Sequence, residues 1–359
     1  MDFLLGERLK ELNGPILITG HTGFKGTWLT LLLEELGISV VGFALPPLEK
    51  TLYSRLGRTN KIPEIYGDIR NLSSVNDAFN EFRPSAVIHM AAQPLVIKSY
   101  EAPIETFETN VMGTVNILDS AIRAKSVKGI VAVTTDKVYR NDESKKRFLE
   151  SDPLSGKDPY SASKVGSEAA IAAWQQISRN IGGPQIVSVR AGNVIGGGDW
   201  SDNRLMPDLM RGFSTRGTVE IRNPNSTRPW QHALDPLLGY LKTLDAILRN
   251  GSSDAYNFGP IEKSLNVGNV AKIAKDTWGA PVKLKILSSN SNMKPEANSL
   301  DLDPSLAIKE LNWHPVWNQT EAVVNTVTWW REIFSNKSTA LALCQDDLKE
   351  FMIKSKKLT

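Results

Sequence analysis

The chain has 359 residues, of which 41% are hydrophobic and 23% charged, with a formal net charge of +3. These values are typical of a globular protein with a sizeable hydrophobic core. A nucleic-acid-binding protein would carry a clustered basic face, which this chain lacks. The single cysteine, Cys344, excludes an intrachain disulfide and suits a reducing cytoplasm.

The first residues, MDFLLGERLKELNG, are too charged for a secretory leader, and the apolar run from Trp28 to Leu33 ends at two glutamates. The four histidines (His21, His89, His232 and His314) lie far apart, without metal-ligand spacing. We therefore expect a cytoplasmic protein with no membrane span and no metal site.

Short β-branched runs alternate with helical patterns in the first half, as in βαβ units of a parallel sheet. The expected strands are Pro15–Thr19, Ser39–Ala44, Glu64–Tyr66, Ser85–His89, Gly129–Thr134 and Gln185–Arg190. The expected helices are Lys25–Leu36, Ser73–Phe82, Pro103–Ala124 and Tyr160–Asn180. Strands such as AVIHM are apolar throughout, which indicates burial on both faces. We predict an α/β fold with a Rossmann-type doubly wound parallel sheet.

The pattern becomes irregular after about Gly192, where glycine, proline, tryptophan and arginine interrupt the apolar segments. We expect residues 1–192 to form the Rossmann domain, with sheet contributions from about 229–260. Residues 193–335 would mainly form a smaller substrate-binding region, and residues 336–359 a loose helical tail.

A glycine-rich turn follows the first expected strand and opens a helix: Gly20-His21-Thr22-Gly23-Phe24-Lys25-Gly26. Gly20 permits the tight turn, Gly23 lets the backbone approach a pyrophosphate, and Gly26 lets the helix pack close to the strand. The N–H groups of the helix start would then bind the diphosphate. A glycine turn without a ligand is the alternative, but the strand–turn–helix context favours a dinucleotide.

The second strand ends in Pro46-Pro47, where an acid would normally bind the ribose hydroxyls. No arginine is present there for a 2′-phosphate, so we favour NAD over NADP. Asp68, after the third strand, is a candidate for the adenine or simply a helix cap. His21 stands where a small residue is usual, and we expect it to crowd the pyrophosphate and weaken NAD binding.

Tyr160 and Lys164 are four residues apart and therefore share one face of a helix. A tyrosine has a pKa near ~10, and a nearby lysine together with a positive nicotinamide would favour the phenolate. Tyr160 would then act as a base near neutral pH. A surface helix pair is the alternative explanation.

The fifth strand runs into Thr134, Thr135, Asp136 and Lys137, at the sheet edge where α/β proteins bind ligands. Thr135 is a candidate to hydrogen-bond a sugar hydroxyl beside Tyr160. Asp136 is a candidate proton donor, and Lys137 is either a base of lowered pKa or a solvated lysine.

Together these residues resemble the extended short-chain dehydrogenases/reductases, over roughly residues 10–335. The stretches that carry the resemblance are ITGHTGFKGTWL (18–29), VIHMAAQPLV (87–96), TTDKVYRN (134–141), DPYSASK (158–164), VRAGNVIGGGDW (189–200) and RPWQHALDP (228–236). Those after residue 165 are typical of the nucleotide-sugar dehydratase branch. Related dehydratases of dTDP-sugars carry Thr-Asp-Glu where this chain has Thr135-Asp136-Lys137, which points to the CDP-sugar branch.

The resemblance implies an NAD-dependent hydro-lyase that converts CDP-D-glucose to CDP-4-keto-6-deoxy-D-glucose for deoxysugar and O-antigen synthesis. Tyr160 would take the proton of the 4-hydroxyl while hydride passes from C4 to NAD. Lys137 or another base would remove the C5 proton, and Asp136 would assist the loss of water from C6. The hydride would then return to C6.

The resemblance also implies ligand contacts. For the cofactor they are Gly20, His21, Gly23, Phe24, Lys25, Gly26, Asp68, Ile69, Ala91, Ala92, Gln93, Asn110, Thr134, Tyr160 and Lys164. For the nucleotide sugar they are Gln93, Asn193, Arg204, Leu205, Arg211, Arg222 and Arg228. The arginines, with Arg190, suit a diphosphate as a cluster, although any one alone can be a solvated surface residue. Trp200 and Trp230 would flank the nucleotide or lie in the core.

Relatives pair their outer helices into a four-helix bundle, so the resemblance implies a homodimer or a dimer of dimers. Ile171 to Trp174 are candidates for that contact, and core packing explains them equally well. A nucleotide-sugar 4-epimerase or another hexose dehydratase on the same scaffold is the alternative enzyme. A non-catalytic dinucleotide sensor is disfavoured because Thr135, Tyr160 and Lys164 are all present.

Overall fold

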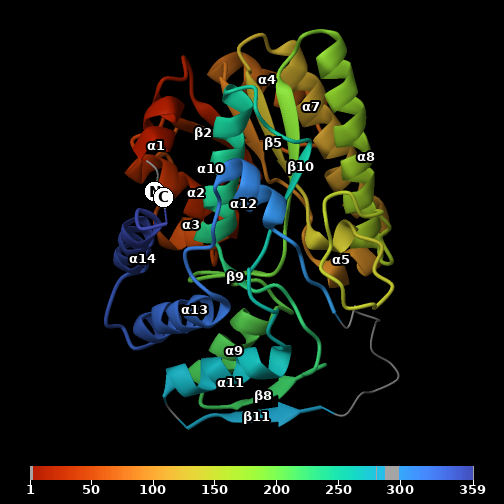
Figure 1. Cartoon of the computed structure of the whole chain (residues 1–359). Coiled ribbons are helices and arrows are strands. Elements are labelled where there is room, and N and C mark those ends of the chain that lie inside the picture. The colour runs from red at the N-terminus through yellow and green to blue at the C-terminus, as the bar shows by residue number, and fades with distance from the viewer. Residues whose placement is uncertain (1–2, 280, 288–298, 359) are drawn as a thin grey trace.

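The computed structural model describes residues 3–279, 281–287 and 299–358. Its upper half is a seven-stranded parallel sheet of order β10-β6-β5-β4-β1-β2-β3 (Figure 1). The strands are β1 (Ile16–Thr19), β2 (Val40–Ala44), β3 (Glu64–Tyr66), β4 (Ala86–His89), β5 (Gly129–Val133), β6 (Gln185–Ala191) and β10 (Ala255–Phe258). The predicted Rossmann-type α/β fold is confirmed.

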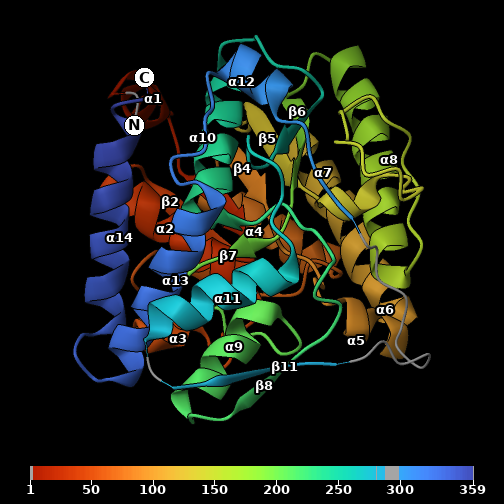
Figure 2. The same ribbon diagram turned by 60° about the horizontal axis from the view of Figure 1, so that its bottom comes forward.

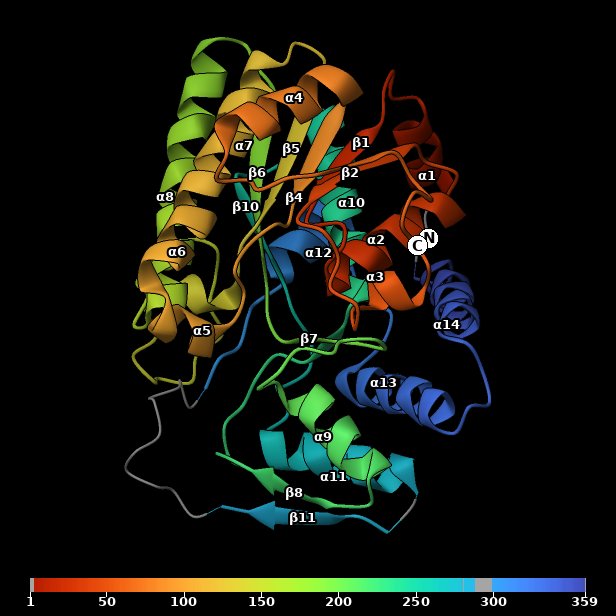
Figure 3. The same ribbon diagram turned by 180° about the vertical axis from the view of Figure 1, so that it is seen from behind.

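Helices cover both faces of the sheet (Figures 1 and 3). One face packs against α2 (Phe24–Glu35) and α10 (Leu234–Leu248), and the other against α4 (Leu72–Phe82), α7 (Gly113–Arg123) and α8 (Pro159–Asn180). Successive strand residues enter opposite cores: Ile16 and Ile18 join the first, and Leu17 joins the second. This double burial is why the strand sequences do not alternate.

The helix expected over Pro103–Ala124 is interrupted. It consists of α6 (Pro103–Phe107), a π-helical turn (Glu108–Met112) and α7, and the short α5 (Val96–Glu101) precedes it. π-Turns often occur at functional sites, and this one contains Asn110.

The lower region carries two small parallel sheets, β7 (Val194–Ile195) with β9 (Gln231–His232) and β8 (Thr218–Ile221) with β11 (Lys283–Ile286). The helices α9 (Leu205–Ser214) and α11 (Val267–Trp278) pack beside them (Figures 1 and 2). Their buried side chains belong to the same core cluster as α2 and α10. Residues 288–298, within the predicted substrate region, lie outside the described residues.

The remaining helices are α1 (Phe3–Lys10), α3 (Leu52–Arg55), α12 (Ser305–Leu311), α13 (Gln319–Phe334) and α14 (Ala340–Ser355). The tail predicted to be loose is the packed helix α14, which lies along one side of the molecule (Figure 2). It buries Cys344, Leu348 and Phe351, and the ring of Phe351 lies 5.2 Å from that of Trp317. Among the described residues, no helix combines the length and the apolar character needed to cross a bilayer.

Because α14 belongs to the core, Phe351→Ala should lower the free energy of unfolding by about 3 kcal/mol. Ile353→Ala is the matched control, because Ile353 lies on the same helix and is 52% exposed. Denaturant unfolding of both variants tests this. Equal stability of the two variants would show that α14 is the loose tail expected from the sequence.

Candidate functional site

The glycine turn joins β1 to α2 at the carboxyl end of β1. Gly20 has a φ of +75°, and a Cβ there would lie 2.9 Å from the backbone of Ala91. A Cβ on Gly26 would lie 2.1 Å from the carbonyl oxygen of Gly20. Gly23 is the N-cap of α2 and has no side chain to cap the helix, so the first N–H groups are available to an anion. These features fit a dinucleotide diphosphate.

The His21 side chain is fully buried between β2 and β3. Its Nε2 lies 2.7 Å from Oε2 of Glu64. The same Oε2 accepts the Tyr53 hydroxyl, and Oε1 of Glu64 accepts the Asn60 N–H. A Cβ on Gly42 would lie 2.5 Å from the imidazole. Burial lowers the pKa of His21 despite the Glu64 contact. The ring is therefore held at β3, and its predicted crowding of the pyrophosphate stays a prediction.

Asp68 and Ile69 follow β3. The Asp68 carboxylate accepts hydrogen bonds from the backbone and side chain of Arg70, and this contact lowers its pKa. The helix cap that we considered for Asp68 is instead Asn71. Ile69 is buried against Gly113. A contact of either residue with the adenine remains a prediction.

The segment after β4 is held by Asn110. Gln93 N–H donates to Asn110 Oδ1 (2.8 Å), and Asn110 Nδ2 donates to the Gln93 carbonyl (3.1 Å) and to Ser163 Oγ (2.9 Å). The Gln93 side chain bonds the backbone of Leu95 and the hydroxyl of Thr106. Asn110 thus joins the Ala91–Gln93 segment to α8.

Tyr160 and Lys164 lie on the face of α8 that meets the end of β5. Burial raises the pKa of Tyr160 to about 12, and a hydrogen bond with Thr135 opposes this. Lys164 Nζ donates to the Val133 carbonyl at 3.1 Å, and burial lowers its pKa to about 8. The protein groups alone therefore leave Tyr160 protonated at neutral pH, and further positive charge is needed to form the phenolate.

Asp136 lies beside Thr135 in a 3₁₀ turn (Asp136–Val138) and is 2% exposed. Its Oδ1 accepts the Thr135 hydroxyl at 2.9 Å, whereas its buried Oδ2 has no hydrogen-bond partner among the residues that the structure describes. Burial raises the pKa of this carboxyl, although Lys137 and Arg228 lower it. Such a group retains a proton more readily than an exposed aspartate, as a general acid requires. Lys137 is half-buried next to it.

Positively charged side chains lie near Thr135, Asp136 and Tyr160. Arg204 lowers the pKa of both Tyr160 and Lys25, and Arg228 lowers that of Asp136. Burial, then Lys164 and Arg204, lower the pKa of Lys25 to about 7. The glycine turn, which carries Lys25, therefore adjoins the Tyr160–Lys164 face.

The other predicted substrate residues are less closely tied to the centre. Arg211 bonds Asp208 and the backbone of Trp200, and Arg222 is exposed just after β8. Asn193 lies where β7 begins, and Leu205 is the first residue of α9. Their contacts with the nucleotide sugar remain predictions.

One assignment made from the sequence needs correction. Arg190 is buried and paired with Glu168, so it does not belong to a diphosphate-binding cluster. For two other residues the sequence left core packing open as an alternative, and the structure shows such packing. Trp200 is partly buried and packs edge-on against Trp330 at 4.4 Å beside the core, and Ile171 belongs to the core between α8 and the sheet.

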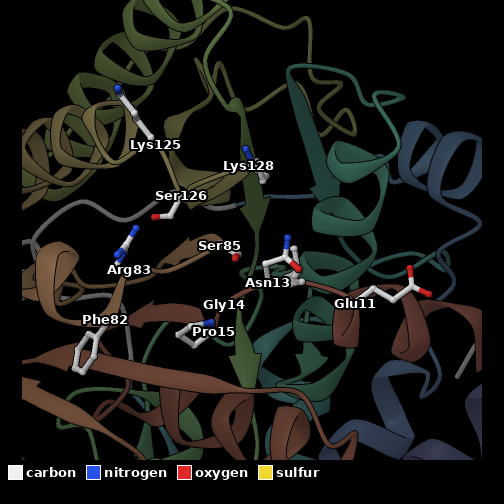
Figure 4. Close-up of a pocket in the computed structure, with 11 residues that line it drawn as sticks. Glu11, Asn13, Gly14, Pro15, Phe82, Arg83, Ser85, Lys125, Ser126 and Lys128 are labelled. Carbon is white, nitrogen blue, oxygen red and sulfur yellow. The ribbon is translucent and has the colours of Figure 1, made fainter.

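A surface pocket lies at the opposite end of the sheet (Figure 4). It is lined by residues that precede β1, β4 and β5, including Gly14, Ser85 and Lys128. The glycine turn and Thr135 follow the carboxyl ends of the strands. The pocket is therefore not part of the candidate site.

Comparison with known proteins gives the family. The protein-family model described as GDP-mannose 4,6 dehydratase matches residues 17–326 of this chain. The CDP-glucose 4,6-dehydratase of Salmonella typhimurium is 43% identical over 324 residues, which cover 88% of this chain and 89% of that protein. The chain belongs to the GDP-mannose 4,6 dehydratase family. It is an extended short-chain dehydrogenase/reductase, as its motifs indicated.

More distant members of the same fold include both dehydratases and epimerases. The UDP-glucose 4-epimerase of Halalkalibacterium halodurans is 27% identical, covering 88% of this chain and 95% of that protein. The crystal structure of DesIV, a dTDP-glucose 4,6-dehydratase from Streptomyces venezuelae with NAD and TYD bound, has a TM-score of 0.75 at 24% identity. It covers 89% of this chain and 97% of that one. The scaffold alone thus does not distinguish the two reactions.

The sequence analysis did not identify two buried carboxylates near this site. Glu64 holds His21, and Glu168 holds Thr134 by a 2.5 Å hydrogen bond. The available signal for Glu168 was its position one helical turn beyond Lys164. Glu64 gave no comparable signal, because its partner His21 is distant in the sequence.

If His21 weakens cofactor binding, His21→Gly should bind NAD about ten-fold more tightly, equivalent to about 1.4 kcal/mol. Isothermal titration calorimetry of the parent and the variant measures this. Tyr53→Phe is the control, since it removes a hydroxyl from Glu64 but leaves the imidazole in place. Unchanged affinity in His21→Gly would contradict the crowding.

Proposed function

We propose that this chain is an NAD-dependent CDP-D-glucose 4,6-dehydratase that forms CDP-4-keto-6-deoxy-D-glucose. The observation that carries the proposal is the buried group formed by Thr135, Asp136 and Tyr160, in a chain 43% identical to a CDP-glucose 4,6-dehydratase. The group offers a base and an acid side by side, as oxidation at C4 followed by loss of water at C6 requires.

The cofactor assignment rests on the glycine turn. Gly20 and Gly26 permit the close packing of β1, the Ala91 backbone and α2, and Gly23 exposes the start of α2. Bound there, NAD would accept the hydride of C4 and later return it to C6. Lys164 would hold the cofactor and supply positive charge beside Tyr160.

Tyr160 takes the proton of the substrate 4-hydroxyl, and Thr135 hydrogen-bonds the same hydroxyl. The 4-ketone acidifies the C5 proton, which Lys137 or another base removes. Asp136 delivers its proton from the unpartnered Oδ2 to the departing C6 hydroxyl. The raised pKa of Asp136 keeps this proton available at higher pH than an exposed aspartate would.

The diphosphate would bind Arg204 and Arg228, because their charges act on the proposed catalytic group: Arg204 lowers the pKa of Tyr160, and Arg228 lowers that of Asp136. The remaining cofactor and substrate contacts predicted from the sequence belong to the same proposal. So do a homodimer or dimer of dimers, a cytoplasmic location and a role in O-antigen synthesis. The 4-epimerase alternative has no use for an acid at C6, so the buried Asp136 favours elimination.

A panel of CDP-, dTDP-, GDP- and UDP-hexoses with detection of the 4-keto product tests the function. CDP-glucose should be dehydrated fastest, and Tyr160→Phe should lower kcat by at least ~100-fold, because the base is lost. The control is Tyr256→Phe, which alters a tyrosine bonded to Glu310 away from the site. Formation of CDP-galactose instead of a 4-keto sugar would identify an epimerase.

Asp136→Asn should retain C4 oxidation but lower the rate of water loss by about 100-fold, because the proton donor is absent. Stopped-flow absorbance should show reduced nicotinamide accumulating after CDP-glucose is mixed in. In the wild type, elimination should slow as the pH rises through the raised pKa of Asp136, since the carboxyl then loses its proton.

The pH dependence should be absent in Asp136→Asn. Asp152→Asn is the control, because Asp152 lies outside the site and pairs with Lys146. Wild-type turnover in Asp136→Asn would remove Asp136 from the mechanism.

A further inference from the structure

The end of β5 is fastened to α8 at three consecutive residues. Val133 accepts Lys164 Nζ through its carbonyl, the Thr134 hydroxyl donates to Glu168, and Thr135 bonds Tyr160. Tyr160, Lys164 and Glu168 follow one another at four-residue intervals, so they form one face of the helix. The first two are the proposed catalytic pair. Glu168 is the third residue of this face and lies one turn beyond Lys164.

Glu168 is surrounded by donors on every side. Its two oxygens accept the Thr134 hydroxyl (2.5 Å), the Ser188 hydroxyl (2.7 Å), and Nε and Nη2 of Arg190 (both 2.8 Å). The side chains of Glu168 and Arg190 are 5% and 6% exposed. A buried ion pair adds little net stability compared with apolar residues of the same shape. The Glu168–Arg190 pair therefore contributes mainly by fixing the positions of the residues that it contacts.

Arg190 extends the contact to the far end of the catalytic segment. Its Nη1 donates to the Tyr139 hydroxyl (2.8 Å) and to the Glu150 carbonyl (3.0 Å), and the Tyr139 hydroxyl donates to Asn257 Oδ1. Thr134 and Tyr139 flank Thr135, Asp136 and Lys137. The Glu168–Arg190 pair therefore holds both ends of the segment that carries these residues.

We infer that Glu168 is a positioning residue for the reaction. Together with Arg190 it clamps the segment 134–139 and fixes the position of this segment relative to α8. Thr135 is thereby placed within hydrogen-bonding distance of Tyr160, and Asp136 is held beside Thr135. This inference rests on the proposed function for its effect on turnover, but its geometric part does not.

Glu168 also acts on Lys164 through charge. Burial lowers the pKa of Lys164, and the Glu168 carboxylate opposes that effect. The other charged or titratable groups that face Lys164 are Lys25 on α2, His89 on β4 and Tyr160 on α8. None of these three groups carries a negative charge at neutral pH, so none can replace the carboxylate. Loss of Glu168 should therefore let Lys164 lose its proton at lower pH.

Glu168→Gln tests both effects with a side chain of the same shape. We expect kcat for CDP-glucose to fall roughly 100-fold with KM little changed, as for a displaced catalytic group. The NMR titration of ¹³Cε-labelled lysine, assigned with Lys164→Arg, should show Lys164 titrating at lower pH. Glu168→Asp keeps the charge but shortens the clamp, so it should restore the titration and not kcat.

Gln175→Leu is the matched control for a structural effect. Gln175 is also buried on α8 and bonds the carbonyls of Ile186 and Asp254, away from the catalytic segment. Its loss should lower the melting temperature but leave kcat and the Lys164 titration unchanged. If Glu168→Gln behaves in the same way, Glu168 is only structural and the inference is wrong.

Tyr139→Phe is the second variant if Glu168→Gln does not fold. It releases only the far end of the segment, so kcat should fall while Lys164 titrates as in the wild type. Unchanged kcat in Tyr139→Phe would overturn the clamp. If the wild type itself does not convert CDP-glucose, the proposed function fails. The Lys164 titration then still decides whether Glu168 controls that lysine.

Discussion

The packing of α8 against the carboxyl end of β5 is the contact on which the site depends. It places Tyr160 beside Thr135 and Lys164 on the carbonyl of Val133, so one helix face meets one strand end. Both elements are rigid because the sheet is buried on both faces. Groups on such elements are held with the precision that the proposed proton and hydride transfers require.

The same packing determines the electrostatics of the candidate site. Burial lowers the pKa of Lys25 and Lys164 and raises that of Tyr160 and Asp136. Each change favours the neutral form, as desolvation must. Burial therefore lets Tyr160 and Asp136 keep their protons to higher pH, and makes Lys25 and Lys164 lose theirs at lower pH, than exposed groups of the same kind. We therefore expect the proposed base, Tyr160, to become active only when a dinucleotide brings its positive charge.

The lower region and the C-terminal helices are not independent additions. α9, α11 and α13 share a hydrophobic cluster with α2 and α10, and α14 joins it through Cys344 and Phe351. Trp28 on α2 donates a hydrogen bond to the carbonyl of Gly197 in the segment after β7. The start of the predicted substrate region is thus attached to the helix that follows the glycine turn, which keeps the two proposed binding regions in a fixed relation.

The sequence alone determined the strands, the glycine turn and the Tyr160–Lys164 pair, because each depends on local spacing. Continuous apolar runs report burial on both faces, and residues four apart share a helix face whatever surrounds them. Only the tertiary structure decided that Arg190 serves Glu168, that His21 faces Glu64 and that α14 is packed. Each of these contacts joins residues that are far apart in the chain, so local spacing does not predict it. A buried charge pairs with whichever opposite charge or donor the fold brings to it, and an apolar helix face packs on whichever core the fold places beside it.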